Sequence, residues 1–237
     1  MSNLSALNKD GYFIAPPLCP PDVLEEMKNI LGTPPGDPNN AILTKNGETF
    51  GIRHALNLFP GIKPLLGPAG ITSLMQKILG KNARIVRSIF FDKTPAANWN
   101  VAIHQDTTVA AKEKHEIEGF TTWTLKAGIP HVQPPEQFLQ NMVTLRLHLD
   151  ETTADNGALR VLPGSHNKGR MKMADILTLR QENTPVLCPV QAGGVMAMRP
   201  LLLHESGAGP NPARRRVLHL ECSADKLPKP LEWYETA

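Results

Sequence analysis

The sequence predicts a mainly β protein, a sandwich or barrel with α-helices packed on its outside. From about Arg84 onward, short apolar runs are separated by Gly, Pro and Asn, which is typical of many short strands joined by turns. Residues 143–150 alternate strictly between apolar and polar side chains, as a strand with one buried face does. Before Arg84 the pattern changes, because two segments there have apolar residues at helical spacing.

The first third of the chain, residues 1–83, is expected to pack as helices and strands on the barrel. A short apolar strand is predicted at residues 12–14. The run Pro20-Pro21-Asp22 favours the start of a helix that ends before Gly32, and a second helix is predicted at residues 71–79. Both helices should lie on the outside of a sheet. The apolar residues that give the first helix its spacing are Val23, Leu24, Met27, Ile30 and Leu31.

The barrel core is expected to comprise residues 84–225. In an open sandwich the polar face of the strand at 143–150 would meet water, whereas in a barrel with a polar cavity Thr144, Arg146 and His148 would point inward. The sequence leaves both possibilities open. Further strands are predicted at 99–103, 158–162, 186–190, 195–203 and 216–222.

Composition excludes several classes of protein. The 237 residues, 41% hydrophobic and 20% charged, suit one globular domain over residues 1–237, without an apolar run that could span a bilayer. We expect no membrane partner and, because the N-terminus lacks the pattern of a secretory signal, a cytoplasmic location. A net charge of +3 is too small to predict binding to nucleic acid. The three widely spaced cysteines predict buried, inert thiols; they are Cys19, Cys188 and Cys222.

The triplet His104-Gln105-Asp106 is the strongest candidate for a metal site. Side chains at positions i and i+2 of a strand emerge on one face, so His104 and Asp106 could reach a single ion. Such a triplet also arises by chance, and it gains weight from His204 downstream. Two imidazoles and one carboxylate are the ligands that hold iron(II) on one face and leave the other positions open to substrates and oxygen.

A basic cluster, Arg214-Arg215-Arg216, opens a strand about ten residues after His204. A guanidinium suits the distal carboxylate of 2-oxoglutarate because its planar fork donates two parallel hydrogen bonds. Turn formers fill residues 205–212, so we expect the chain to reverse there and to return as an antiparallel neighbour. A solvated basic turn is the alternative explanation for each single arginine.

Residues 107–142 form a long insertion between the triplet and the next clear strand. An irregular segment of this length beside a site is typical of a lid or binding loop. The remaining histidines are expected to have other roles. His166 should hydrogen-bond locally in a turn, and His219 shares the strand parity of Arg215 without a carboxylate to pair with. Surface or lid positions are expected for His54, His115, His131 and His148.

The chain resembles the phytanoyl-CoA dioxygenase family of iron(II)- and 2-oxoglutarate-dependent oxygenases. The resemblance covers most of the chain. It is carried by Asp10-Gly11-Tyr12, by the segment from Phe91 to Asp106, by the run from Asp155 to His166 that ends in Pro-Gly-Ser-His, and by residues 204–215. It implies a double-stranded β-helix core, the jelly-roll or cupin-like fold, with flanking α-helices.

The resemblance also assigns roles to single residues. His104, Asp106 and His204 would be the metal ligands and catalytic centre, and Arg215, eleven residues past the distal histidine, would bind 2-oxoglutarate. Ser206 matches a hydroxyl that assists the same carboxylate, and Trp123 is similar to an aromatic residue that flanks the cosubstrate. The roles of Lys93, Lys126 and Arg146 stay open.

The implied reaction is hydroxylation of an unactivated C–H bond of a small molecule, which consumes O2 and converts 2-oxoglutarate to succinate and CO2. Asp106 favours hydroxylation over halogenation, because related halogenases carry a small residue in its place. The substrate is not readable; a small carboxylate or other polar metabolite is our expectation, with Arg146, Lys126 and the insertion lining its pocket. Two alternatives remain, a non-catalytic jelly-roll protein that binds metal or 2-oxoglutarate, and a zinc-dependent hydrolase. Oligomeric state is not readable either.

Overall fold

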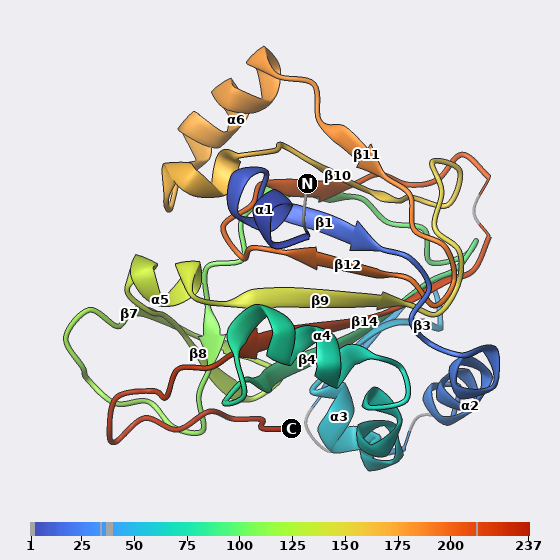
Figure 1. Ribbon diagram of the computed structural model, residues 1–237, viewed down its shortest axis with the longest axis horizontal. Coiled ribbons are helices and arrows are strands. Elements are labelled where there is room, and N and C mark those ends of the chain that lie inside the picture. The colour runs from blue at the N-terminus through green and yellow to red at the C-terminus, as the bar shows by residue number, and fades with distance from the viewer. Residues whose placement is uncertain (1–2, 34, 37–39, 212) are drawn as a thin grey trace.

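Two antiparallel sheets form the centre of the molecule (Figure 1). The computed structural model describes residues 3–33, 35–36, 40–211 and 213–237. Within these residues the larger sheet has the strand order β1 (Tyr12–Ala15), β12 (Val195–Met198), β9 (Val143–His148), β14 (Arg215–Ser223), β4 (Arg84–Lys93), β3 (Glu48–Arg53) and β2 (Ile42–Lys45). The smaller sheet has the order β11 (Val186–Cys188), β10 (Leu159–Val161), β13 (His204–Ser206) and β5 (Val101–His104).

Helices cover the outer face of the larger sheet, as predicted. The two predicted helices are confirmed as α2 (Pro21–Leu31) and α4 (Ile71–Leu79), the first with Pro21 in its first turn, where a missing N–H costs nothing. In Figure 1, α3 and α4 lie in front of the larger sheet, and their apolar residues share one core with its strands. The other helical segments are α1 (Asn3–Lys9), α3 (Ala55–Leu58), the 3-10 helices Pro60–Leu66 and Ser165–Lys168, α5 (Glu136–Gln140) and α6 (Met173–Glu182).

Strand β9 decides the question that its alternating pattern left open. Leu145 and Leu147 point into the core shared with the helices and are fully buried. Their polar neighbours Thr144, Arg146 and His148 are also buried, with exposed fractions of 0%, 5% and 2%. Because successive side chains of a strand point to opposite faces, this polar face points inward, toward the smaller sheet.

Two expectations about the chain before and after His204 are wrong. The predicted strand at 195–203 ends at Met198, because Pro200 cannot donate to a sheet ladder and the chain turns there. The segment after β13, within the run of turn formers at 205–212, does not return the chain to a neighbouring strand of the same sheet. Strand β13 pairs with β10 and β5 in the smaller sheet, whereas β14 pairs with β4 and β9 in the larger one. The chain therefore crosses from one sheet to the other.

The insertion at residues 107–142 is ordered rather than irregular. It contains a three-stranded antiparallel sheet, β6 (Val109–Ala110), β8 (Ile129–Gln133) and β7 (Thr121–Lys126), followed by α5. Figure 1 shows β7, β8 and α5 together at the left end of the larger sheet. The sequence reasoning also missed the β2–β3 hairpin, whose Asn46-Gly47 turn has positive φ at both residues, and helix α6.

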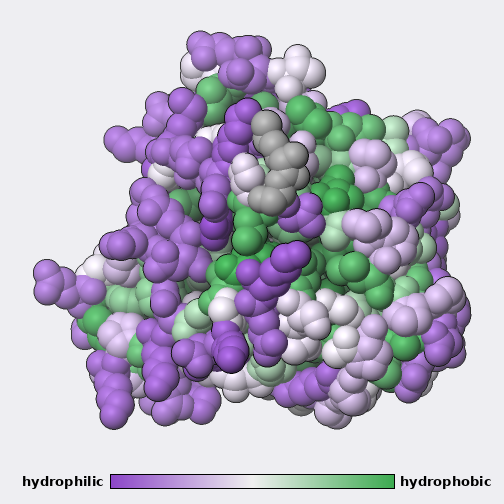
Figure 2. Space-filling model, viewed as in Figure 1, coloured by the Kyte–Doolittle hydropathy of each residue, from purple (hydrophilic) through white to green (hydrophobic). Residues whose placement is uncertain are grey.

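The surface hydropathy and the burial of the cysteines agree with what the composition predicts. Figure 2 shows hydrophilic residues over the left side of this face and hydrophobic residues gathered near its middle. In the described parts of the chain, no helix combines the length and the apolar character that crossing a bilayer requires. All three cysteines are buried and unpaired, and burial raises the pKa of each thiol, as expected of inert groups.

Candidate active site

A cavity of about 90 Å³ lies between the two sheets. The larger sheet contributes Arg146, Arg215 and His219, and the smaller sheet contributes His204 and His104, with Asp106 just past the end of β5. Polar residues that lie far apart in the sequence therefore line one small cavity. The other lining residues are Ile89, Phe91, Trp99, Val101, Leu159 and Ser206.

His104, Asp106 and His204 converge at this cavity. His104 and His204 are direct cross-strand partners of β5 and β13, which brings their rings to a centroid distance of 4.2 Å. The Nε2 atom of His104 lies 3.9 Å from Oδ1 of Asp106, and that of His204 lies 3.7 Å from Oδ2. Oδ2 of Asp106 is buried without a hydrogen-bond partner. One donor atom from each residue lies within 4.8 Å of the others, close enough to share an ion.

Both imidazoles are held in the tautomer that a metal needs. Nδ1 of His104 donates to the Ala102 carbonyl at 2.8 Å, and Nδ1 of His204 donates to the Leu202 carbonyl at 2.9 Å. With the proton fixed on Nδ1, each Nε2 carries a free lone pair that points to Asp106. Burial lowers the pKa of His204 to about 3, so its ring stays neutral. Burial raises the pKa of Asp106, but the positive charges that His204, His219 and His104 carry when protonated, together with the Arg87 charge, lower it below its ordinary value, and the carboxyl is ionised.

Gln105 explains why His104 and Asp106, on either side of it, both point toward the cavity. Its side chain points away from the cavity, and its amide nitrogen donates to the carbonyls of Gly169 and Leu201, each at 2.8 Å. Its amide oxygen accepts from the Met171 N–H at 2.9 Å. These bonds fix the backbone between His104 and Asp106, so the two ligand candidates keep a common direction.

Arg215 lies at the other end of the cavity, beside Ser206 and Lys93. Its guanidinium and the Ser206 hydroxyl both donate to the Gly157 carbonyl. The Lys93 ammonium is fully buried and donates to the Gly207 carbonyl at 2.8 Å. Burial lowers the pKa of Arg215 to about 9 and, together with the nearby Arg215 charge, that of Lys93 to about 7. Sequence reasoning left Lys93 unassigned because its partners lie on distant segments.

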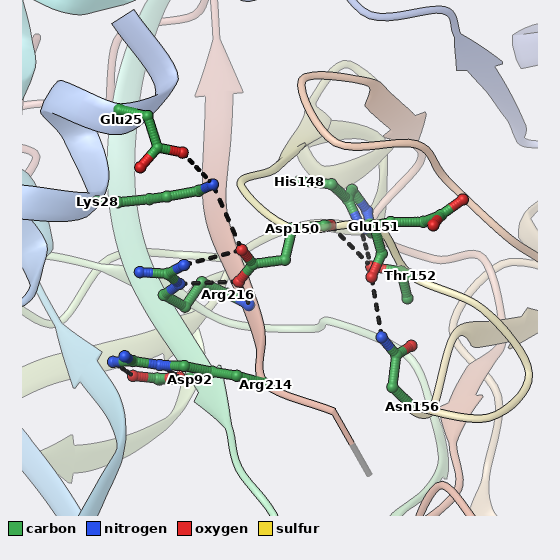
Figure 3. Close-up of polar contacts among 10 residues, drawn as sticks. All are labelled: Glu25, Lys28, Asp92, His148, Asp150, Glu151, Thr152, Asn156, Arg214 and Arg216. Carbon is green, nitrogen blue, oxygen red and sulfur yellow. Dashed lines mark hydrogen bonds and ion pairs between the residues drawn. The ribbon is translucent and has the colours of Figure 1, made fainter. Parts of the chain in front are cut away.

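The arginines on either side of Arg215 point away from the cavity. Arg214 makes two hydrogen bonds to Asp92, and Arg216 makes two side-chain bonds to Asp150, which also lies 3.6 Å from the Lys28 ammonium (Figure 3). Each outer arginine thus has an acid of its own within the fold. Arg215 has none among the described residues and remains the cation of the three that is free to bind a ligand.

Arg146 and His219 form a second polar pair, nearer to the metal candidates. They are cross-strand partners on β9 and β14, and Arg146 Nη1 donates to His219 Nδ1 at 2.8 Å. His219 was expected to have no carboxylate partner, and this is wrong, because its Nε2 lies 3.6 Å from Glu221. Donor atoms of Asp106, His219 and Glu221 all lie within 4.8 Å of one another.

Trp123 and Lys126 come from the insertion. Trp123 is half-buried on β7 against a separate apolar cluster and is not among the residues that line the cavity; the indole that does line it is Trp99. Lys126 donates to Thr108 at 3.2 Å. Burial and the Arg87 charge lower its pKa, while the charges of Glu221 and Asp106 oppose this; Lys126 is not among the residues that line the cavity.

Several other histidines are buried, where surface or lid positions were expected; His131 does lie on the insertion. His54, His131 and His148 have exposed fractions of 3%, 0% and 2%, because the helices, the insertion and the inward face of β9 enclose them. Burial lowers the pKa of each below its ordinary value. His166 is also buried, and its partner is not local, since its Nε2 lies 3.2 Å from the Asn8 carbonyl. His115 alone of the expected surface group is partly exposed.

Comparison with known proteins identifies the family of the chain. Residues 7–217 match the family model described as phytanoyl-CoA dioxygenase (PhyH), so the chain belongs to the PhyH family, and the resemblance drawn from its motifs is confirmed. A phytanoyl-CoA dioxygenase 1 from Oryza sativa subsp. japonica is 26% identical over 71% of this chain and 55% of its own length. A probable alpha-ketoglutarate-dependent hypophosphite dioxygenase from Stutzerimonas stutzeri is 29% identical over 63% of this chain and 46% of its own length.

The fold has close counterparts among solved structures. EctD from S. alaskensis, crystallised with 2-oxoglutarate and 5-hydroxyectoine, superposes with a TM-score of 0.73 at 20% identity, over 96% of this chain and 77% of that chain. The predicted mainly β jelly-roll fold with flanking helices is confirmed. The chain spans about half to two thirds of the length of the curated relatives it matches.

Proposed function

We propose that this protein is an iron(II)- and 2-oxoglutarate-dependent dioxygenase that hydroxylates a C–H bond of a small molecule. The observation that carries the proposal is the convergence of His104, Asp106 and His204, with both imidazoles fixed in the metal-binding tautomer. Three protein ligands leave open positions for a cosubstrate and oxygen. The names of the relatives and the cosubstrate in the EctD crystal support the same reading.

The cavity supplies the other requirements of such a reaction. Arg215 would bind the distal carboxylate of 2-oxoglutarate, assisted by Ser206, and both already point to one carbonyl that a ligand can replace as their partner. Iron held by His104, Asp106 and His204 would supply the oxygen chemistry, in which one atom of O2 would enter the hydroxyl group and the other the succinate formed as 2-oxoglutarate loses CO2. The protein's contribution is to orient both organic molecules and to keep water away from them.

The ionised Asp106 supports hydroxylation rather than halogenation, since it fills the position that a halide would take. The substrate is proposed to be a small carboxylate or other polar metabolite. In support, the cavity is small, and the name of the S. stutzeri relative is that of an enzyme for a small oxyanion. The insertion at residues 107–142, with Lys126, is proposed to cover the site, and the protein is proposed to act in the cytoplasm.

Anaerobic addition of iron(II) and 2-oxoglutarate tests the metal site directly. The wild type should give a weak visible charge-transfer band, and His104→Ala and Asp106→Ala should lose it. His115→Ala is the matched control, because this histidine lies on the insertion, pairs with Glu113 and should leave the band unchanged. A wild type without the band, or a full band in His104→Ala, would contradict the proposal.

Turnover separates the enzyme from the alternatives. Succinate release coupled to O2 uptake should appear with iron(II) and disappear when zinc replaces it. A protein that only binds 2-oxoglutarate would show the band without succinate, and a zinc hydrolase on the same three ligands would be active with zinc and inactive with iron.

A further inference from the structure

The side chain of Arg146 is a buried cation at the metal end of the cavity. It has an exposed fraction of 5% and lines the cavity beside His104, Asp106 and His204. One nitrogen donates to His219 at 2.8 Å, and the guanidinium lies 5.8 Å from the centre of the Phe91 ring. Its Nε is buried without a hydrogen-bond partner. His219 and Phe91 therefore hold the group in place but leave part of its donor set unused.

Arg146 lacks the acid that other arginines of this fold possess. Arg87 pairs with Glu221 at 2.7 Å, and Arg214 and Arg216 pair with Asp92 and Asp150. In the described part of the chain, no ion pair joins Arg146 to a carboxylate. The Asp106 charge raises the pKa of Arg146, but the two carboxylate oxygens of Asp106 lie against His104 and His204. A buried charge without a counterion is costly, unless a ligand supplies the opposite charge when it binds.

The cavity is therefore lined by two guanidiniums, those of Arg146 and Arg215, that have no carboxylate partner among the described residues. Arg146 is paired in register with His219, which lies four residues along β14 from Arg215, about 13 Å at the rise of a strand. Arg215 is the candidate for the distal carboxylate of 2-oxoglutarate. A second anionic group is needed for Arg146, at the end where the metal ligands and the reacting bond would lie.

The charges around this end also favour an anion. Arg87 and Glu221 form an ion pair of their own at 2.7 Å, so the Glu221 carboxylate does not leave Arg146 neutralised. A cation-rich cavity with low-dielectric walls attracts small anions. We infer that Arg146, held by His219, is an oxyanion-binding residue, and that the substrate is a small anion whose acid group binds there. This inference rests on the proposed oxygenase function.

The carboxylate next to the keto group of 2-oxoglutarate is also an anion that Arg146 could bind. The experiment must therefore distinguish binding of this carboxylate from binding of an anionic substrate. The anaerobic iron(II) and 2-oxoglutarate complex is prepared for the wild type, Arg146→Gln and Arg146→Lys. Arg160→Gln, which changes an exposed arginine of β10, is the control. Propionate and hypophosphite are then titrated as anionic probes, and propionamide as a neutral probe, with the position of the charge-transfer band and the melting temperature as readouts.

The wild type and Arg160→Gln should bind the two anions saturably and should ignore propionamide. Arg146→Gln should bind them about 10- to 100-fold more weakly, the range for losing one charged hydrogen-bond partner, while keeping its affinity for 2-oxoglutarate. Arg146→Lys should lie between them, because it keeps the charge and loses the fork. If Arg146→Gln does not fold, the comparison of Arg146→Lys with the wild type tests the inference.

Other outcomes overturn the inference in distinct ways. If Arg146→Gln binds 2-oxoglutarate more weakly but binds the anionic probes as the wild type does, Arg146 binds the cosubstrate. The inference that it binds the substrate is then wrong. Equal binding of all probes by every variant would show that Arg146 binds no anion. Both outcomes leave the band of the wild type intact, whereas absence of that band would instead remove the proposed function.

Discussion

Arg214, Arg215 and Arg216 are consecutive residues with three different surroundings. The alternation of strand β14 sends Arg215 into the cavity and its two neighbours to the opposite side, where Asp92 and Asp150 bind them. A basic run that looks uniform in sequence therefore contains one candidate ligand-binding residue and two residues that fasten β14 to nearby segments.

This difference predicts unequal effects of one conservative change. Arg215→Lys should weaken 2-oxoglutarate binding by about 10- to 100-fold, because an ammonium cannot donate two parallel bonds to a carboxylate. Arg214→Lys, the matched control on the outer face, should bind like the wild type. Titration of the anaerobic iron complex with 2-oxoglutarate measures both, and equal affinities for the two variants would argue against a role for Arg215.

Lys93 predicts a pH dependence of stability. Burial lowers its pKa to about 7 in the folded protein, against 10.5 for the unperturbed group. Between these two values the unfolded chain holds a proton that the folded protein lacks, so the free energy of unfolding should rise as pH increases from about 7 to about 10. The penalty of burying the charge is fully present below pH 7.

Replacement of Lys93 isolates this effect from other titrating groups. Lys93→Met should be more stable than the wild type below pH 7, and the advantage should shrink toward pH 10. Urea unfolding of the metal-free proteins at several pH values gives the difference. A difference that does not change with pH would mean that Lys93 stays charged in the fold.

The segment between β9 and β10 carries Gly157, whose carbonyl accepts hydrogen bonds from Arg215 and Ser206. Its φ of +84° is one that residues with a side chain rarely adopt. An added Cβ would lie 2.6 Å from the Gly207 carbonyl oxygen and 2.8 Å from the Lys93 ammonium. The loop thus fits closely against the 2-oxoglutarate end of the cavity.

Gly157→Ala should therefore destabilise the protein by roughly 1–3 kcal/mol and weaken 2-oxoglutarate binding. Gly67→Ala is the control, since that glycine has a helical φ of −66° and open space around it. It should be neutral or slightly stabilising. Thermal or urea unfolding compares the two, and an unchanged Gly157→Ala protein would show that the loop can move aside without cost.

At the scale of the whole molecule, the candidate ligand-binding residues are divided between the two sheets. His104 and His204 belong to the smaller sheet, and Arg215 and Arg146 belong to the larger one. A metal ion with 2-oxoglutarate would bridge them. Ligands that bind only the folded state stabilise it by mass action.

We expect manganese(II), as an inert substitute for iron, and 2-oxoglutarate together to raise the melting temperature. At a cosubstrate concentration about 100 times its Kd, the gain is about 2.7 kcal/mol, or roughly 5–10 °C for a protein of this size. His204→Ala should lose the effect of both ligands. A shift in His204→Ala equal to that of the wild type would place the binding elsewhere in the molecule.

Much of this fold could be read from local patterns. The helices at 21–31 and 71–79 and the strand at 143–148 were predictable because apolar spacing and flanking Pro or Gly residues act within a few positions. Helix α6 was not, because it is mainly exposed and has one buried residue, Ile176, so its sequence shows little periodicity.

The sequence by itself determined the metal-ligand candidates, His104, Asp106 and His204, together with Arg215, because strand parity and family motifs are properties of the chain. Only the tertiary structure decided where the polar face of β9 points, and hence that Arg146 is buried in the cavity beside His219. It also decided that His204 and Arg215 face each other from different sheets. The alternating pattern of β9 shows only that its two faces differ. Which face is exposed to water depends on the segments that pack against the strand, and these are distant in the sequence.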